Sequence, residues 1–186
     1  MIEVDATLPR SRTNGPGLRY VLWLKGCTLG CPGCFNPLTH PSTGGLTRQI
    51  GELVSEIRSL VPEIEGVSIS GGEPFQQPDG LLELVSAVRQ HTPLSLLVFS
   101  GFKHEEICRI PVGPRVLDKI DVLVAGRYVA SARDGRALLG SANQRVHFLT
   151  DRYGPWDLEA VPEMEVYIGA DGEIVMSGIG GPTVRI

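Results

Sequence analysis

The stretch Tyr20-Val-Leu-Trp-Leu-Lys-Gly-Cys-Thr-Leu-Gly-Cys-Pro-Gly-Cys34 joins an apolar run directly to a group of three cysteines. Residues 20–25 carry branched and aromatic apolar side chains, a pattern typical of a buried strand. Residues 26–45 are rich in glycine, proline, asparagine, serine and threonine, and therefore predict a long loop. Long loops in compact domains are usually functional or disordered. The cysteines thus lie on a loop that begins where a strand ends.

Strands and helices alternate along the rest of the chain. Three further strands are predicted over 66–70, 94–100 and 120–125, and three helices over 46–61, 79–91 and about 104–109. This alternation indicates β-α-β units and a parallel sheet. Near the C-terminus, two apolar runs flank Asp171-Gly172 and predict a hairpin. The repeats are too few for a closed eight-fold barrel, so we expect an α/β fold, an open partial (β/α) barrel with a C-terminal β-hairpin.

The composition excludes several classes of protein for this chain. The chain has 186 residues, 42% of them hydrophobic, and a net charge of −4, which fits one soluble domain without a strong attraction to nucleic acid. No stretch approaches the roughly 20 apolar residues of a membrane span, and the N-terminus lacks a signal-peptide pattern. We therefore expect a cytoplasmic protein with no membrane or nucleic-acid partner. Four cysteines in such a protein indicate metal ligands or free thiols rather than disulfides.

Three turns that carry thiol, carboxylate or hydroxyl side chains follow predicted strands. They are the cysteine loop, the turn Gly71-Gly72-Glu73-Pro74 and the turn that begins at Ser100. In sheets of this kind, ligands bind at the carboxyl ends of the strands. The three turns are therefore expected to meet at one rim.

The spacing of Cys27, Cys31 and Cys34 is C-x3-C-x2-C. A structural zinc ion takes four ligands, and His40 is the nearest candidate for the fourth. A redox pair normally opens a helix, which this irregular loop does not. A 4Fe-4S cluster held by three thiolates leaves one iron open for a substrate. Cys108 is an alternative fourth thiolate, although its apolar helical surroundings favour simple packing.

The cysteine spacing after one strand and Gly-Gly-Glu-Pro after the next resemble the radical SAM superfamily. The resemblance implies a 4Fe-4S cluster on Cys27, Cys31 and Cys34 whose open iron is chelated by S-adenosylmethionine. One electron then cleaves this cofactor to methionine and a 5′-deoxyadenosyl radical, which abstracts a hydrogen atom. The resemblance also implies cofactor-binding residues: Gly71, Gly72 and Glu73 for the amino group, Ser100 for the ribose or carboxylate, and Phe35 and Asn36 beside the adenine.

Other positions carry weaker implications. Arg145 offers a guanidinium that matches the cofactor carboxylate, and Asn143 accompanies it, although both also fit a solvated loop. Many superfamily members have an aromatic residue where Gly33 stands. The four histidines show no clustering in the sequence and are expected to be surface or packing residues.

Four segments resemble the activating enzymes of glycyl-radical enzymes, in particular the activase of anaerobic (class III) ribonucleotide reductase. They are Asn14-Gly-Pro-Gly-Leu-Arg19, Cys31-Pro-Gly-Cys-Phe-Asn36, Asp121-Val-Leu-Val-Ala-Gly126 and Gly140-Ser-Ala-Asn-Gln-Arg145. The resemblance covers roughly residues 10–150. It implies a single radical SAM domain over 1–186, with a core at about 14–150 and a hairpin at about 163–178.

The same resemblance implies partners. The hydrogen atom comes from a glycine of a glycyl-radical enzyme, and flavodoxin or ferredoxin supplies the electron. Ala125 replaces an acidic residue of the relatives, so we expect no monovalent cation there, and Asn14 replaces an aspartate. Two alternatives remain: a stand-alone radical SAM enzyme acting on a peptide or small metabolite, and a non-catalytic zinc or iron–sulfur protein.

Overall fold

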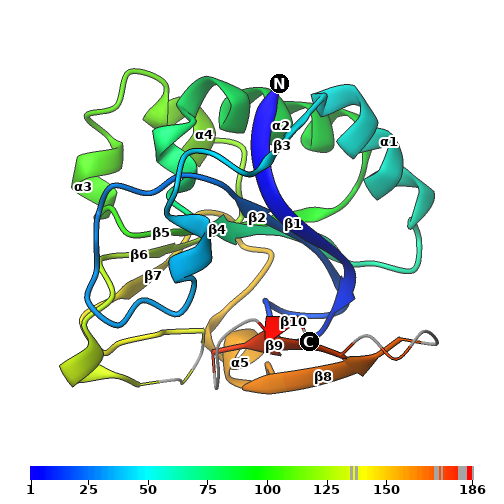
Figure 1. Ribbon diagram of the computed structural model, residues 1–186. Coiled ribbons are helices and arrows are strands. Elements are labelled where there is room, and N and C mark those ends of the chain that lie inside the picture. Colours follow the sequence, from blue (N-terminus) through cyan, green and yellow to red (C-terminus); the bar gives the residue numbers. More distant parts are fainter. Residues whose placement is uncertain (135, 137, 170–171, 173, 180–183, 186) are drawn as a thin grey trace.

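A seven-stranded mixed sheet forms the centre of the computed structural model, which describes residues 1–186 except 135, 137, 170–171, 173, 180–183 and 186. The strand order is β3-β1-β2-β4-β5-β6-β7 (Figure 1). The strands are β1 (Ile2–Ser11), β2 (Arg19–Leu24), β3 (Leu46–Arg48), β4 (Gly66–Gly71), β5 (Ser95–Ser100), β6 (Val122–Ala125) and β7 (Arg145–Phe148). The α/β class expected from the sequence is confirmed.

Parallel strands make up the middle of this sheet. β2, β4, β5 and β6 run parallel, whereas β1, β3 and β7 are antiparallel to their neighbours. The four parallel strands are those predicted from apolar runs, and they are buried throughout most of their length. The antiparallel edges were not predicted. β1 does carry the signal of a half-buried strand, because buried Ile2, Val4 and Leu8 alternate with more polar residues.

Four helices cover one face of the sheet (Figure 1). They are α1 (Ile50–Ser59), α2 (Pro78–His91), α3 (His104–Ile107) and α4 (Gly113–Leu117). Helix α1 begins at Ile50, so the helix predicted from residue 46 is wrong in its first turn. Residues 46–48 pair instead with β1, with Leu46 opposite Val4. This pairing gives the start of β1 hydrogen-bond partners on the side away from β2, and makes β3 the edge strand. No helix among the described residues combines the length and apolar character needed to cross a membrane.

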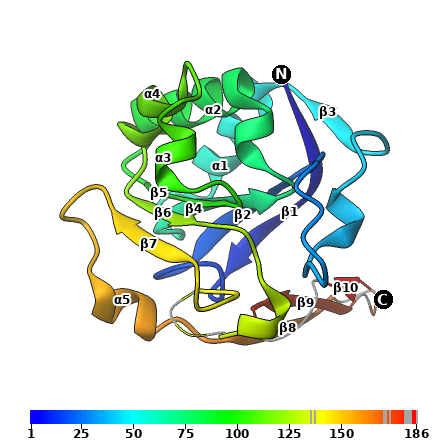
Figure 2. The same ribbon diagram turned by 90° about the vertical axis from the view of Figure 1, so that its left-hand side faces the viewer.

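The other side of the sheet carries helix α5 (Pro155–Glu159) and a small second sheet (Figures 1 and 2). The second sheet has the order β10-β9-β8 and consists of β8 (Met164–Ile168), β9 (Ile174–Gly178) and β10 (Val184–Arg185). β8 and β9 form the predicted C-terminal hairpin, which is confirmed. Part of its predicted Asp171-Gly172 turn lies outside the described residues.

A buried arginine fastens the parallel strands near the ends where they begin. Arg19 is fully buried, and its guanidinium donates to Ser68 Oγ (2.7 Å), Ser95 Oγ (2.9 Å) and the carbonyl of Val67 (3.0 Å). Burial lowers its pKa from the ordinary value. These bonds join β2, β4 and β5 side by side. The loops that follow the three strands are therefore held in fixed positions relative to one another.

At the opposite ends of β2 and β4 the two backbones touch. The amide of Gly72 donates to the carbonyl of Leu24 (2.8 Å), and the amide of Glu73 donates to the carbonyl of Gly26 (2.8 Å). Gly71 has φ +100°, and a Cβ on it would lie 2.4 Å from the nitrogen of Leu24. A Cβ on Gly72 would lie 2.2 Å from the carbonyl oxygen of Gly26. Both glycines are therefore needed for one backbone to approach another.

Replacement of Gly71 by alanine tests this contact. Gly71→Ala should lower the free energy of unfolding by at least about 2 kcal/mol, because it adds backbone strain and a collision. Urea denaturation of the protein prepared without iron measures this change. The matched control is Gly51→Ala in α1, where nothing lies within 4 Å of the added Cβ. The control should be neutral or more stable by up to about 1 kcal/mol. Equal stability of the two variants would contradict the account.

Candidate functional site

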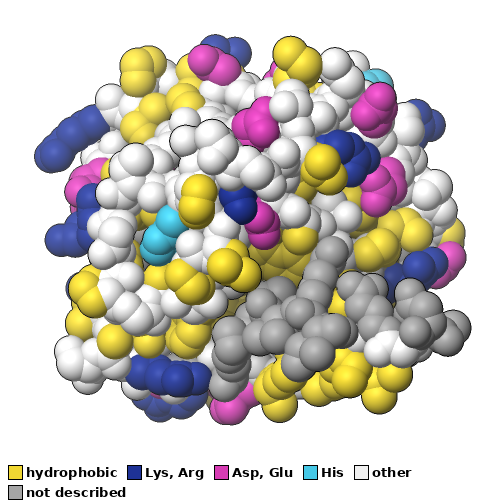
Figure 3. Space-filling view, viewed as in Figure 1, with side chains coloured by type: hydrophobic (Ala, Val, Ile, Leu, Met, Phe, Trp, Pro, Cys, Tyr) yellow, Lys and Arg dark blue, Asp and Glu magenta, His cyan; other side chains and the backbone are white. Residues whose placement is uncertain are grey.

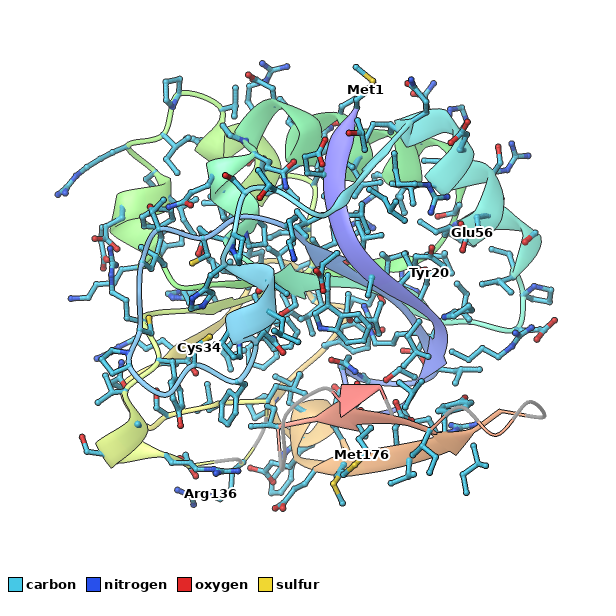
Figure 4. The ribbon with its side chains drawn as sticks, in the orientation of Figure 1. Met1, Tyr20, Cys34, Glu56, Arg136 and Met176 are labelled. Carbon is cyan, nitrogen blue, oxygen red and sulfur yellow. The ribbon has the colours of Figure 1, made fainter. Side chains whose placement is uncertain are left out.

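A cavity of about 160 Å³ lies where β2, β4 and β5 end. The three turns singled out in the sequence meet there, as expected. The predicted residues that line it are Cys27, Cys31, Cys34, Phe35, Asn36, Gly71, Gly72, Glu73 and Ser100. Figure 4 shows Cys34 on the loop that leaves the end of β2. The cavity thus brings thiols, a carboxylate and an aromatic ring to one place.

The cysteine loop is closed at its base. The amide of Gly26 donates to the carbonyl of Thr39 (2.8 Å), and the amide of Cys27 donates to the carbonyl of His40 (2.9 Å). Lys25, which is nearly buried, bonds through Nζ to the carbonyl of Leu38 (2.6 Å) and pairs with Asp5 (2.6 Å). The loop between residues 26 and 40 therefore has a fixed base, which limits where its thiols can lie.

The backbone within the loop accounts for the glycine at position 33. Gly33 has φ +72°, and a Cβ there would lie 3.3 Å from Cβ of Ala130. An aromatic side chain at this position would be strained and crowded. The aromatic wall of the cavity comes instead from Phe35 and Tyr128, whose ring centroids are 4.5 Å apart. Sequence reasoning missed Tyr128, which lies just after the Asp121–Gly126 segment.

The donor chemistry of the three cysteines fits an iron–sulfur cluster. Burial raises the pKa of the Cys27 and Cys34 thiols, while the backbone amides of Leu29 and Asn36 act in the opposite direction. Within the described part of the chain, no group of three or more His, Cys, Asp or Glu side chains is arranged to hold a single metal ion. The three thiolates of a cluster bind different iron atoms and can stand further apart than the ligands of one zinc ion.

The structure distinguishes between the two alternative fourth ligands, His40 and Cys108. His40 lines the same cavity as the three cysteines, whereas Cys108 is not among its lining residues. Cys108 is exposed, so the expectation that it packs in an apolar environment is wrong; its helix turns it toward solvent, with Sγ 3.8 Å from Nδ1 of His104. His104 packs against His147, with ring centroids 4.9 Å apart, a contact that the sequence did not indicate.

Glu73 is the buried acid of the site. One of its oxygens accepts from the amide of Phe75 (3.0 Å) and from Ser100 Oγ (2.8 Å), and the other accepts from the amide of Gly101 (2.7 Å). Burial raises the pKa of Glu73 to about 7, although these hydrogen bonds lower it. None of the ion pairs found among the described residues involves Glu73. The cavity therefore contains a carboxylate that only neutral donors stabilise.

Asn143 and Arg145 lie away from this cavity. Together with Lys103 and His147 they line a separate hollow, and the side chain of Asn143 donates to the carbonyl of Arg127 (2.8 Å). Gln144 lies between them in sequence and lines the cavity; its Nε2 donates to the carbonyl of Gly126 (2.7 Å). The three residues pass from a turn into β7, and only the middle one lines the cavity.

The cavity also has a wall that sequence reasoning did not assign. Thr13, Asn14 and Trp23 line it beside Gly178 and Ile179 of the hairpin region. Asn14 donates through Nδ2 to Ser177 Oγ of β9 (2.7 Å) and to Ser11 Oγ (2.8 Å). The only signal for this wall was the Asn14–Arg19 segment, whose side chains carry no obvious ligand chemistry.

The raised pKa of Glu73 gives a pH dependence of stability. An acid that is harder to ionise in the folded protein stabilises it below about pH 4.5, and this contribution is lost as the pH rises to about 7. Glu73→Gln should remove that loss, so its free energy of unfolding should fall less than that of the wild type between these pH values. Thermal or urea unfolding of iron-free protein at several pH values measures the difference. The exposed Glu105→Gln should keep the wild-type slope, and a wild-type slope in Glu73→Gln would refute the assignment.

Comparison with known proteins agrees with this site. The model of the family described as a 4Fe-4S single cluster domain matches residues 13–147. The chain is 34% identical to the anaerobic ribonucleoside-triphosphate reductase-activating protein of Escherichia coli K12, over 76% of this chain and 95% of that protein. The proteins of the same name from Salmonella typhimurium LT2 and Enterobacteria phage T4 are 32% and 31% identical. Those matches cover 76% and 83% of this chain, and 95% and 98% of the relatives. The chain therefore belongs to the 4Fe-4S single cluster domain family, among the anaerobic ribonucleoside-triphosphate reductase-activating proteins.

Proposed function

We propose that the chain is a radical SAM activating enzyme that creates the glycyl radical of an anaerobic ribonucleoside-triphosphate reductase. The observation that carries the proposal is that Cys27, Cys31 and Cys34 line one cavity with the Gly71-Gly72-Glu73 turn. The family membership supports it, because the relatives bear the name of activators of that reductase.

In this proposal the three thiolates of Cys27, Cys31 and Cys34 hold a 4Fe-4S cluster and leave one iron without a protein ligand. With S-adenosylmethionine bound there, a reduced cluster would supply one electron for its cleavage to methionine and a 5′-deoxyadenosyl radical. The protein residues position the reactants and exclude water and competing groups. The closed base of the cysteine loop would fix the ends of the segment that carries the three cysteines.

Glu73 would accept the amino group of S-adenosylmethionine. Its carboxylate is fully buried and receives only neutral hydrogen bonds, so an ammonium group entering the cavity would find an unpaired negative charge. Ser100 would act by orienting that carboxylate, to which it already donates. Phe35, Asn36 and the ring of Tyr128 would border the adenine, and Gln144 takes the place beside the cavity first assigned to Asn143 and Arg145.

The wider arrangement is part of the same proposal. The chain would be a single radical SAM domain, with β2, β4, β5 and β6 as the parallel strands of a partial barrel. A partial barrel leaves one side open to a loop of a partner protein, which suits a glycine that belongs to a folded enzyme. The electron would come from flavodoxin or ferredoxin, and the setting would be the cytoplasm.

Replacing single cysteines tests the ligand assignment. Cys27→Ala, Cys31→Ala and Cys34→Ala should each lose most of the roughly four irons and four sulfides per chain that the wild type holds, because a cubane on two thiolates is labile. Iron and sulfide analysis of anaerobically reconstituted protein measures this loss. Cys108→Ala is the matched control and should keep the full content. Loss of iron in Cys108→Ala, or one zinc without sulfide in the wild type, would reject the assignment.

The proposed activity has its own test. Reduced protein is mixed with S-adenosylmethionine and the anaerobic ribonucleoside-triphosphate reductase of the same organism, and the glycyl radical is sought as a doublet by electron paramagnetic resonance. We expect the doublet with the wild type and at least a hundredfold less of it with Cys31→Ala. Cleavage of S-adenosylmethionine without a doublet would contradict the activating role and leave an enzyme that acts on a different substrate.

A further inference from the structure

One face of the C-terminal hairpin is entirely apolar. In the antiparallel pairing of β8 and β9, Val166 lies opposite Met176 and Ile168 lies opposite Ile174. Directly paired residues share a face of the sheet, and alternate residues of one strand do so as well. The side chains on this outer face are those of Met164, Val166, Ile168, Ile174 and Met176. The three on β8 are 48%, 51% and 73% exposed, respectively.

The opposite face of the hairpin contacts the body of the protein through Glu165 and Ser177, although Tyr167 on the same face is 40% exposed. The carboxylate of Glu165 accepts from the amide of Arg12 (3.0 Å) and from Thr13 Oγ1 (3.1 Å). On β9, Ser177 is buried and accepts from the side chain of Asn14. These contacts fix which way the hairpin faces, so the outer face points away from the seven-stranded sheet. Figure 4 shows Met176 on that outward side, and Figure 3 shows hydrophobic side chains along the same margin of the molecule.

This outer face is continuous with the rim of the cofactor cavity. Gly178 ends β9 and lines the cavity together with Ile179, and Gly178 lies opposite Met164 of the outer face. Thr13 and Asn14, which hold the hairpin, line the cavity too. A molecule seated on the outer face would therefore lie next to the opening through which a substrate reaches the three cysteines.

The composition of the face is unusual for a surface in contact with water. Contiguous exposed apolar side chains on soluble proteins usually mark an interaction site. Strand β8 is also an edge strand in the described residues, and edge strands are normally protected by charged side chains. None of the five outward side chains is charged. A partner would bury this face by apolar contact, with little dependence on salt.

We propose that this outer face, formed by Met164, Val166, Ile168, Ile174 and Met176, is the docking surface for the glycyl-radical reductase. The inference rests on the proposed function. It follows from the location of the face, because a folded protein that brings a backbone glycine into the cavity must contact the rim beside it. Because the face is uncharged, we expect the partner to present an apolar patch to it.

Charge substitution on β8 tests the docking surface. Ile168→Lys, and the double variant Val166→Lys with Ile168→Lys, should raise at least tenfold the reductase concentration that gives half of the maximal glycyl doublet. Cleavage of S-adenosylmethionine by dithionite-reduced protein without reductase should stay within twofold of the wild type. The matched control is Leu46→Lys, since Leu46 is 65% exposed, lies on the edge strand β3 of the other sheet and does not line the cavity. It should activate the reductase like the wild type.

A second measurement needs no variant. Amide hydrogen exchange of the wild type should slow at least fivefold over residues 164–168 and 174–178 when the reductase is added. Unchanged exchange there, or unchanged activation by both lysine variants, overturns the docking surface. A wild-type dimer that Ile168→Lys converts to a fully active monomer also overturns it, and assigns the face to a second copy of the chain. A wild type that cleaves the cofactor but gives no doublet rejects the proposed function instead, and the docking surface with it.

Discussion

The structure depends on the place where the backbones of β2 and β4 meet. Two amide-to-carbonyl bonds, from Gly72 to Leu24 and from Glu73 to Gly26, join the end of one strand to the start of the cysteine loop. No side chain fits between them, which accounts for the glycine pair more directly than room for a ligand does. Because of this contact, the loop that carries the thiols and the turn that carries Glu73 form one wall. The site is thus a consequence of how two neighbouring parallel strands end.

The buried carboxylate of Glu73 makes this wall suited to binding a positively charged group. A fully buried carboxylate with only neutral donors is costly to ionise, and its pKa is raised accordingly. Carboxyl groups with a strongly raised pKa are found mainly at functional sites of proteins. A bound ammonium group would offset the cost in the assembled enzyme. Ser100 and Gly101, from the end of β5, keep the carboxylate oriented and so involve a third strand in the site.

Much of this arrangement was predictable, and the misses have physical causes. Continuous apolar runs identified the four parallel strands, and the position of the turns after them identified the rim. The antiparallel strands β1, β3 and β7 were missed because their residues are less buried than those of the parallel strands and their pairing depends on distant segments. Of the motif at 140–145, Gly140 and Gln144 line the cavity, whereas Asn143 and Arg145 do not. Side-chain direction in an irregular segment depends on backbone geometry that spacing does not encode. Tyr128 was missed for the same reason.

The central claim is that three protein thiolates leave one iron open for S-adenosylmethionine. The most direct measurement is electron–nuclear double resonance of the reduced, anaerobically reconstituted protein with S-adenosylmethionine labelled with carbon-13 at the carboxylate. The account predicts a resolved carbon-13 coupling to the cluster that disappears in Cys34→Ala along with the cluster signal. A normal cluster signal in the wild type without any carbon-13 coupling, at saturating S-adenosylmethionine, would contradict it.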